Sequence, residues 1–181
     1  MAVLPILTVP HPLLKQVSRP VREEEFGDQL EARMRDMAET MYAAPGVGLA
    51  GVQIGDLRRI IVCDPSENDE ETGERKRTGL LLLVNPEIVQ TADDPITWEE
   101  GCLSVPDFWE DVTRPQRALV RWRSPDGTPN ERWFEGFPAV VIQHEMDHLE
   151  GVVILDKVSR LKRSRYLKKA KKAGHHTVIN S

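Results

Sequence analysis

Residues 138–149 read PAVVIQHEMDHL, and this stretch predicts a buried helix that carries a metal site. His144 and His148 stand at positions i and i+4, which lie on the same face of an α-helix. Two imidazoles placed in this way can bind one metal ion, with Glu145 close enough to accept a proton from water at that ion. The apolar residues before His144 disfavour a surface helix with two unrelated histidines, because burying these groups without a task would be costly. The pattern therefore predicts a metal centre with Glu145 as catalytic base.

The third ligand does not come from the patterns that zinc proteases use. A catalytic site of this kind takes three protein ligands and leaves one position open. No acid follows Asp156, and Ile154 occupies the place of the third histidine in H-E-x-x-H-x-x-G-x-x-H. Cys102 remains, in the segment Glu100-Gly101-Cys102-Leu103-Ser104, and a thiolate is a strong ligand for a borderline divalent metal. The flanking glycine and proline indicate a tight segment at Cys102 rather than the interior of a regular strand.

The pattern of apolar residues around this helix predicts an α+β fold. Helices are expected over residues 23–42 and, at the C-terminus, about 159–173. Strands are expected over residues 59–63 and 80–89, in a hairpin formed by 119–122 and 132–134, and after Gly151, with an exposed loop over 65–79. Strands and helices do not alternate, so we expect mostly antiparallel sheets packed around a central metal-binding helix, followed by a C-terminal helix.

Composition indicates one folded domain spanning residues 1–181. Hydrophobic residues make up 40% of the chain and charged residues 29%, as in ordinary globular proteins. No apolar run approaches the roughly 20 residues that cross a bilayer, and the N-terminus lacks the features of a secretory signal. We therefore expect a cytoplasmic protein without a membrane partner. Its two cysteines should be reduced, with Cys63 buried in a strand.

Charge is distributed unevenly along the chain. Nine of the 24 basic residues lie between positions 157 and 172, and no acid follows Asp156. The rest of the chain is strongly acidic as a result. A basic C-terminal segment on an acidic body indicates either a polyanionic docking partner or a solvated helix that folds back on the body.

A third segment, GVGLAGVQ, lies at residues 46–53. The three segments together point to a protein family more specifically than any one of them does. Alone it indicates a turn leading into a strand, and it lacks the Gly-Lys-Ser/Thr of a phosphate-binding loop. With Glu100–Ser104 and Gln143–His148 it resembles the peptide deformylase family, whose motifs G-x-G-L-A-A-x-Q, E-G-C-L-S and Q-H-E-x-D-H occur in this order. Gly51 departs from the usual alanine, which we expect to loosen the segment without removing a functional group.

The resemblance implies a metal-dependent hydrolase that removes the formyl group from the N-terminal formyl-methionine of new polypeptides. It implies that Cys102, His144 and His148 bind the metal. Glu145 then transfers the proton between the attacking water and the leaving amine. The Gln53 amide and the Leu103 backbone N–H are the implied donors to the oxyanion. For the substrate, we expect an apolar methionine pocket and strand-like backbone pairing from the following residues: Val47, Gly48, Gly101, Val140 and Val141.

Three further expectations concern the metal, the C-terminal helix and the cysteine segment. A Cys-His-His set accepts zinc, iron, cobalt or nickel, and the resemblance favours Fe2+ in cells, with Zn2+, Ni2+ or Co2+ as alternatives. The family's C-terminal helix is linked to the ribosome, which predicts ribosome docking for the basic helix here. We also expect Glu100 to pair with Arg114 and brace the cysteine segment.

Two other functions remain as alternatives. A metalloendopeptidase shares H-E-x-x-H but lacks a third ligand of the protease type here. A structural-zinc or ribosome-associated binding module would need a fourth protein ligand, which the sequence does not offer clearly.

Overall fold

The computed structural model describes residues 2–65, 67–68, 75–76 and 79–173 of the chain. Its main sheet has five antiparallel strands in the order β1-β2-β5-β8-β9, and β6 pairs with β7 in a separate hairpin. The strands are β1 (Gly48–Ala50), β2 (Ile60–Cys63), β3 (Glu67–Asn68), β4 (Arg75–Lys76), β5 (Leu81–Thr91), β6 (Pro95–Cys102), β7 (Val105–Pro115), β8 (Arg117–Arg123) and β9 (Pro129–Glu135). The helices are α1 (Asp28–Ala43), α2 (Phe137–Leu149) and α3 (Arg160–Lys172), with 3-10 turns η1 (Pro12–Lys15), η2 (Glu23–Glu25), η3 (Gly51–Ile54) and η4 (Ile154–Asp156).

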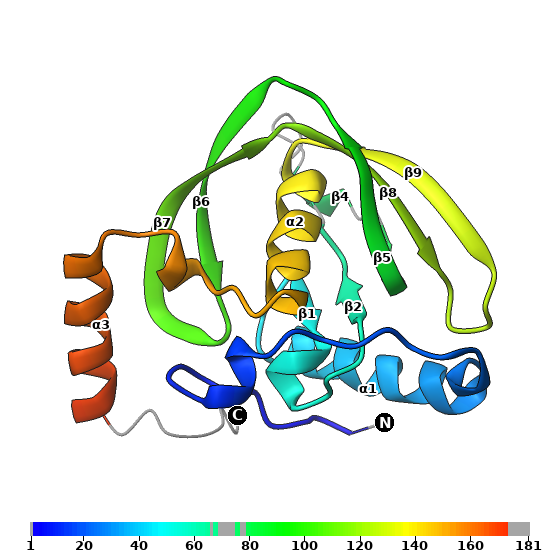
Figure 1. Cartoon of the computed structure of the whole chain (residues 1–181), viewed down its shortest axis with the longest axis horizontal. Coiled ribbons are helices and arrows are strands. Elements are labelled where there is room, and N and C mark those ends of the chain that lie inside the picture. The colour runs from blue at the N-terminus through cyan, green and yellow to red at the C-terminus, as the bar shows by residue number, and fades with distance from the viewer. Residues whose placement is uncertain (1, 66, 69–74, 77–78, 174–181) are drawn as a thin grey trace.

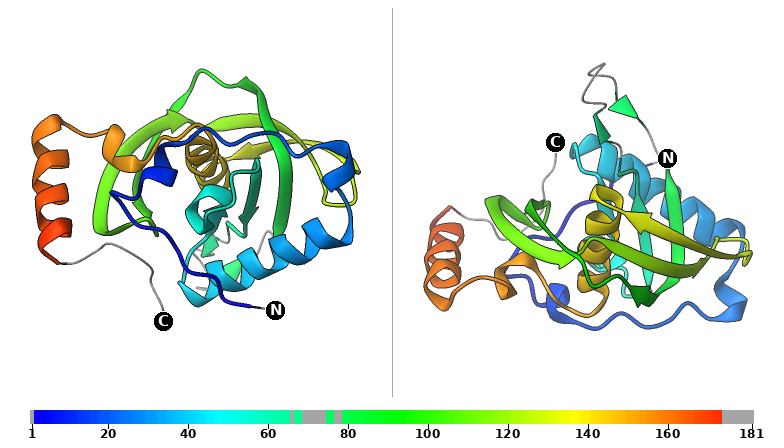
Figure 2. Two further views of the ribbon diagram at one scale, coloured as in Figure 1. Left: turned by 60° about the horizontal axis from the view of Figure 1, so that its bottom comes forward. Right: turned by 90° about the horizontal axis from the view of Figure 1, so that it is seen from above.

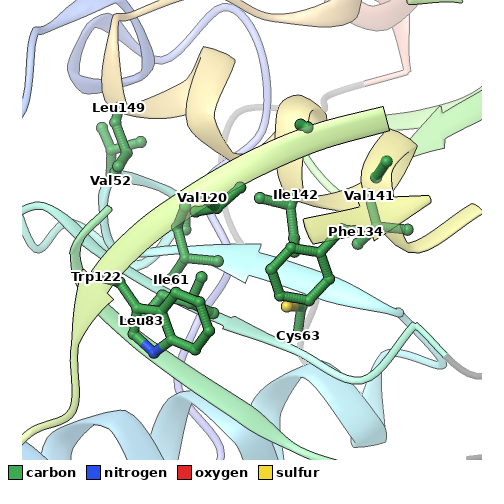
Figure 3. Packing of buried hydrophobic residues seen from close by; sticks show 13 residues of the cluster. Val52, Ile61, Cys63, Leu83, Val120, Trp122, Phe134, Val141, Ile142 and Leu149 are labelled. Carbon is green, nitrogen blue, oxygen red and sulfur yellow. The ribbon is translucent and has the colours of Figure 1, made fainter. Parts of the chain in front are cut away.

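Helix α2 occupies the centre of the molecule (Figure 1). It contacts β1, β2 and β9 of the main sheet as well as β7 of the hairpin. Buried residues of α2 pack with β2, β5, β8 and β9 in one hydrophobic cluster, in which Ile142 and Val141 lie near Phe134 and Cys63 (Figure 3). Antiparallel sheets around a central helix, with a helix at the C-terminal end, confirm the predicted α+β class.

Strand β2 shows why one run of apolar residues can be buried on both faces. All four of its residues are buried, and successive side chains of a strand point to opposite faces. Ile61 and Cys63 belong to the cluster with α2, while Ile60 and Val62 pack with α1. The methionines of α1 that face the sheet, Met34, Met37 and Met41, are fully buried there. They are core residues, as their helical spacing predicts.

A third cluster joins the β6–β7 hairpin to the C-terminal part of the chain. Val105 and Val112 of the hairpin pack with Val153, Ile154 and Leu155. Residues of α3 add to this cluster, and α3 itself lies on the outer side of the hairpin, away from α2 (Figure 2). None of the helices in the described part of the chain is long and apolar enough to cross a membrane.

Three expectations about secondary structure need correction. The first helix begins at Asp28, because the chain is extended at Phe26, whose ring lies 4.0 Å from the Arg123 guanidinium carbon. The apolar residues after Gly151 form the 3-10 turn η4 rather than a strand, since they pack into the third cluster without pairing to a strand. Glu100 lies inside β6, where a tight segment was expected, whereas Cys102 is the last residue of β6 and has an irregular register with β7, as expected. Most of the predicted loop 65–79 lies outside the described residues, and the short strands β3 and β4 fall within it.

Candidate metal centre

Cys102, His144 and His148 come together at one point of the structure. Cys102 ends β6, and the two histidines project from α2, one turn apart. Their ligand atoms all lie within 4.8 Å of one another, and Cys102 Sγ is 3.3 Å from His148 Nε2. Among the described residues, this is the group of histidine, cysteine and acidic side chains that could hold an ion. One thiolate and two imidazoles form a donor set suited to a borderline divalent cation.

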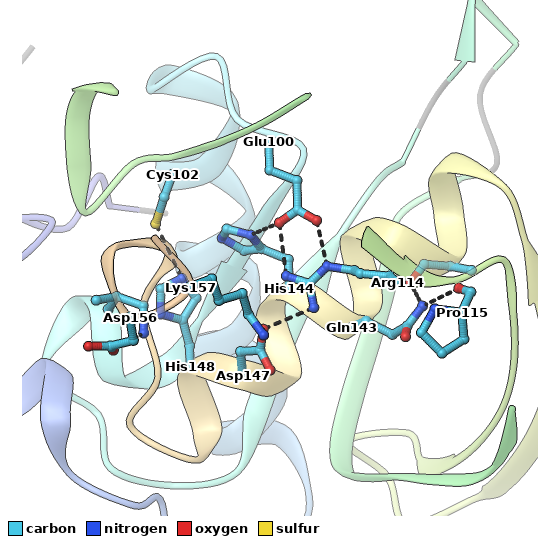
Figure 4. A network of polar contacts seen from close by, with 12 residues as sticks. Glu100, Cys102, Arg114, Pro115, Gln143, His144, Asp147, His148, Asp156 and Lys157 are labelled. Carbon is cyan, nitrogen blue, oxygen red and sulfur yellow. Dashed lines mark hydrogen bonds and ion pairs between the residues drawn. The ribbon is translucent and has the colours of Figure 1, made fainter. Parts of the chain in front are cut away.

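A buried polar network fixes the orientation of His144 (Figure 4). Its Nδ1 lies 2.8 Å from Oε2 of Glu100, which leaves Nε2 free to face Cys102 and His148. Arg114 donates from Nε and Nη2 to the same carboxylate and from Nη1 to Asp147 at 2.9 Å. Partners of this kind set the tautomer and direction of a ligand histidine. The predicted pairing of Glu100 with Arg114 is confirmed, and it braces both β6 and α2.

Glu100 is ionised within this network. Burial raises the pKa of its carboxyl group, but hydrogen bonds from Arg114 and His144 outweigh burial and hold the pKa below its usual value. Both members of the Glu100–Arg114 pair are about 95% buried. A buried carboxylate therefore stands permanently behind His144.

Glu145 and His148 each present a buried polar atom without a partner. Glu145 Oε2 and His148 Nδ1 make no hydrogen bond within the described ranges. Such atoms are rare in folded proteins and indicate a missing water, ion or ligand. Burial raises the pKa of Glu145 to about 7, which suits a group that both accepts and donates a proton near neutrality. The unpartnered Glu145 oxygen fits a centre that takes a cation and a water molecule, whereas His148 presents Nε2 rather than Nδ1 to Cys102.

The two histidines differ in their affinity for protons. Burial lowers the pKa of His148 well below its ordinary value, so this imidazole is neutral and available as a ligand. Burial also lowers the pKa of His144, but contacts with Cys102 and Glu100 outweigh it and raise the pKa. A cation would replace the proton on Nε2, which faces Cys102, and would leave the Nδ1 proton shared with Glu100.

Gly48 makes room for the Glu145 side chain. A Cβ added at Gly48 would overlap the carboxylate and lie 2.8 Å from Cγ of Glu145. The absence of a side chain at this position in β1 therefore lets the carboxylate lie against the strand. The third glycine of the segment, Gly51, does not loosen it as expected. A Cβ there would lie 2.7 Å from the backbone oxygen of Asp56, so Gly51 permits close packing.

Gln53 and Leu103 approach the centre from two different segments. Gln53 lies in η3, is 1% exposed, and has its Nε2 atom 3.8 Å from Cys102 Sγ. Leu103 lies in the turn that follows Cys102, between β6 and β7. Both residues line the same cleft as the ligands.

The cleft beside the centre has a volume of about 550 Å³ and a mostly apolar wall. Of the residues predicted from sequence, His148 lies behind the wall, 1% exposed. The others line the cleft: Val47, Gly48, Gln53, Gly101, Cys102, Leu103, Val140, Val141, His144 and Glu145. An apolar cavity with a few convergent polar groups is the usual form of a ligand site.

Sequence reasoning missed the aromatic side chains of the cleft. Trp98 and Phe137 line it with ring centroids 5.1 Å apart, and Trp109 lines it while 65% exposed. The signal for Trp98 was present, because alternate residues of a strand share a face and Trp98 stands at that spacing from Glu100 and Cys102. Trp109 and Phe137 belong to other elements, and no local pattern links them to the cysteine segment.

Comparisons with known proteins agree with these observations. The family model described as "Polypeptide deformylase" matches residues 3–164. A peptide deformylase of Phenylobacterium zucineum (strain HLK1) is 52% identical over 172 residues, which cover 95% of this chain and 97% of that protein. The crystal structure of a peptide deformylase from Ehrlichia chaffeensis in complex with actinonin has a TM-score of 0.86 and 37% identity, covering 96% of this chain and 98% of its own.

A further solved structure carries a short peptide. A class I type b peptide deformylase from Acinetobacter baumannii, bound to Met-Ala-Ser, has a TM-score of 0.80 and 32% identity, covering 87% of this chain and 99% of its own. The extent of these matches, together with a Cys-His-His cluster beside an apolar cleft, leads to one conclusion: the chain belongs to the peptide deformylase family.

Proposed function

We propose that this protein removes the formyl group from the N-terminal formyl-methionine of newly made polypeptides and releases formate. The observation that carries the proposal is the cluster of Cys102, His144 and His148, with the unpartnered carboxylate oxygen of Glu145 beside it in an apolar cleft. The Met-Ala-Ser peptide on the Acinetobacter baumannii relative supports a methionyl peptide as the occupant of the cleft.

Cys102, His144 and His148 would hold one divalent cation. When bound, the cation polarises the formyl oxygen and lowers the pKa of water, so that a nucleophile exists near neutral pH. The mixed sulfur and nitrogen donors accept Fe2+, Zn2+, Ni2+ or Co2+ without choosing among them. Membership of the deformylase family favours Fe2+ in cells.

Glu145 moves the proton in this mechanism. Its carboxylate accepts a proton from the attacking water and later donates it to the nitrogen of the leaving amine. A pKa of about 7, raised by burial, lets the group both take up and release a proton near neutral pH. Gly48 leaves the space that this side chain needs.

Gln53 and Leu103 stabilise the negative charge that develops on the formyl oxygen. The Gln53 side-chain amide and the Leu103 backbone N–H are the donors in this proposal, and both residues line the cleft beside Cys102. Donors fixed before the reaction need no reorganisation in the transition state. Leu103 follows Cys102 directly, so one turn of the chain positions both a ligand and a donor.

The apolar part of the cleft binds the methionine side chain, because a formyl group is too small to supply the binding energy. We assign Val47, Val140 and Val141 to this pocket, which Trp98 and Phe137 extend. The backbone at Gly48 and Gly101 would pair with the peptide in an extended conformation.

Helix α3 would contact the ribosome, whose surface is rich in phosphate. Lys162 pairs with Glu110 and Arg163 with Asp156, which anchors the helix to the body. The remaining basic residues of the helix form no ion pair with any residue that the structure describes: Arg160, Arg165, Lys168, Lys169, Lys171 and Lys172. Two interpretations of the basic segment, a docking surface and a helix that folds back on the body, are therefore both supported. Two basic residues of the helix pair with the body, and the others face solvent. Deleting residues from Arg160 onward should weaken salt-sensitive ribosome binding and spare activity on short peptides.

We also propose that residues 1–181 act as one catalytic domain in the cytoplasm. Packing supports this, because α2 contacts both the main sheet and β7, and the third cluster ties the hairpin to α3.

Formate release from formyl-Met-Ala-Ser tests the proposal. Anaerobically purified wild type should release formate, and Glu145→Ala should bind one equivalent of metal without releasing it. Bound metal without formate release in the wild type would reject the proposal in favour of a binding module. Internal cleavage of a longer peptide would instead favour an endopeptidase.

A further inference from the structure

Ser104 closes the E-G-C-L-S segment, and the proposed function gives it no task. The residue lies in the turn between β6 and β7 with 0% of its surface exposed. Its hydroxyl oxygen is 3.0 Å from Nε2 of Gln53, which is itself buried. The contact joins two segments that are far apart in sequence, and both of them line the cleft wall at Gln53 and Cys102.

The orientation of the Gln53 amide follows from its partners. The backbone N–H of Ala50 donates to Gln53 Oε1 at 2.8 Å. A backbone N–H can only donate, so the oxygen of the amide must face Ala50 and the nitrogen must face the other way. Of the two hydrogens on Nε2, one is donated to the Ser104 hydroxyl. The other is directed at Cys102 Sγ, which accepts from Nε2 at 3.8 Å and lies at the edge of the cleft.

The amino-terminal segment fixes the backbones of both residues. The Leu7 N–H donates to the Gln53 carbonyl at 2.7 Å, and the Val9 N–H donates to the Ser104 carbonyl at 2.9 Å. One short segment therefore holds η3 and the β6–β7 turn at a constant separation. With both backbones held, the Ser104 hydroxyl controls the remaining freedom of the amide, which is rotation about the Ala50 hydrogen bond.

We infer that Ser104 is a positioning residue for Gln53. By accepting one Nε2 hydrogen it directs the second toward the place where the formyl oxygen becomes negative. This inference rests on the proposed function, in which Gln53 donates to that oxygen. A donor that is aimed in advance stabilises the transition state more than one that must rotate into place.

The first test compares two substitutions of the same kind. Ser104→Ala should lower kcat for formyl-Met-Ala-Ser about tenfold and leave KM unchanged, because a donor to the transition state is affected and ground-state binding is not. Ser18→Ala is the matched control, since Ser18 is 3% exposed and its hydroxyl has no hydrogen-bond partner within the described residues. Ser18→Ala should keep the wild-type kcat. Equal kcat in the two variants would overturn the inference.

A double-substitution cycle separates positioning from a general structural effect. Gln53→Ala should lower kcat about a hundredfold, as the loss of an oxyanion donor does. Adding Ser104→Ala to it should change kcat no further, because Ser104 acts through Gln53. Independent, multiplying losses would overturn the inference. Ser104→Cys, which fills similar space with a weaker acceptor, should give an intermediate kcat and serves if the alanine variant does not fold.

Nuclear magnetic resonance of the side-chain amide gives a readout that does not depend on turnover. The two Gln53 Nε2 proton signals are identified by their loss in Gln53→Ala. They should shift and exchange faster with solvent in Ser104→Ala, and stay in place in Ser18→Ala. Unchanged signals in Ser104→Ala would reject the role of Ser104 while leaving deformylation intact. A wild type that binds metal without releasing formate would reject the proposed function, and with it this inference.

Discussion

Helices α2 and α3 have the same length, 13 residues each, yet they differ in almost every other property. Nine residues of α2 are buried, whereas Ala170 is the buried residue of α3. Two polar side chains of α2 are held by neighbours on β6 and β7, His144 by Glu100 and Asp147 by Arg114. Those of α3 mostly face solvent, and the helix is held by contacts such as the hydrogen bond from the Tyr166 hydroxyl to the Pro106 carbonyl.

This contrast separates α2, which carries the proposed chemistry, from α3, which carries the proposed docking surface. On α2 each side chain meets packed neighbours, so a change there alters the geometry of the site. On α3 a change of charge alters the surface and leaves the packed centre as it is. Substitutions in and around α2 should therefore have large effects on turnover or stability, and those on α3 should have small ones.

The largest effect is expected at Glu145. Glu145→Gln keeps the shape of the side chain but removes its capacity to carry the proton, so formate release should fall about a thousandfold. Glu150→Gln is the matched control, because this exposed residue follows the end of the same helix and pairs with Arg59. It should retain the wild-type rate. A fast Glu145→Gln enzyme with normal metal content would break the assignment of the base.

The next effect concerns stability. Arg114→Met leaves Glu100 buried without its main partner, and removing one member of a buried pair costs about 3 kcal/mol of unfolding free energy. Arg121→Met is the control, since Arg121 and Glu131 form an exposed pair whose loss should cost less than about 1 kcal/mol. Urea unfolding at neutral pH measures both. Equal losses would show that burial does not distinguish the two pairs.

The sign of the pH dependence sharpens this prediction. Burial raises the pKa of Glu100, but its hydrogen bonds from Arg114 and His144 outweigh burial and lower it below the unfolded value. The stability from this pair is therefore complete above the unfolded pKa and is lost as the pH falls through the lowered pKa. The difference in unfolding free energy between wild type and Arg114→Met should therefore become smaller as the pH falls. A difference in unfolding free energy that grows in acid would contradict the pairing of Glu100 with Arg114.

A smaller effect is expected at Gly48. Gly48→Ala places a methyl group against Cγ and the carboxylate of Glu145, and displacing the base by about 1 Å should lower kcat about a hundredfold. The metal ligands lie elsewhere, so metal content should stay at one equivalent. Unchanged kcat would mean that Glu145 can shift without loss of function.

The smallest effect is expected on α3. Lys162→Met removes an exposed pair with Glu110 and should lower the unfolding free energy by less than about 1 kcal/mol, a loss that high salt should abolish. Its rate on formyl-Met-Ala-Ser should equal that of the wild type. A marked loss of activity on this short peptide would break the separation of α3 from the chemistry.

Much of the centre was predictable because its signals are local. The spacing of His144 and His148 places them on one face of any helix, and the apolar residues before them require that helix to be buried. The helical spacing of the α1 methionines likewise predicted core residues. The β6–β7 hairpin was not predicted from the sequence. Acidic residues such as Glu99 and Asp111 stand opposite each other in its register, and they obscure the alternation of apolar and polar residues that indicates a strand.

By itself the sequence determined the α+β class, the central metal-binding helix, the basic C-terminal helix and the order of three motif segments. Tertiary structure alone decided which partners these segments meet: Glu100 behind His144, Ser104 beside Gln53, and the Trp98–Phe137 pair in the cleft. The physical reason is the range of the forces that act. Helical periodicity is set by neighbours within a turn or two, whereas contacts between distant segments depend on strand register and packing, which no local pattern encodes.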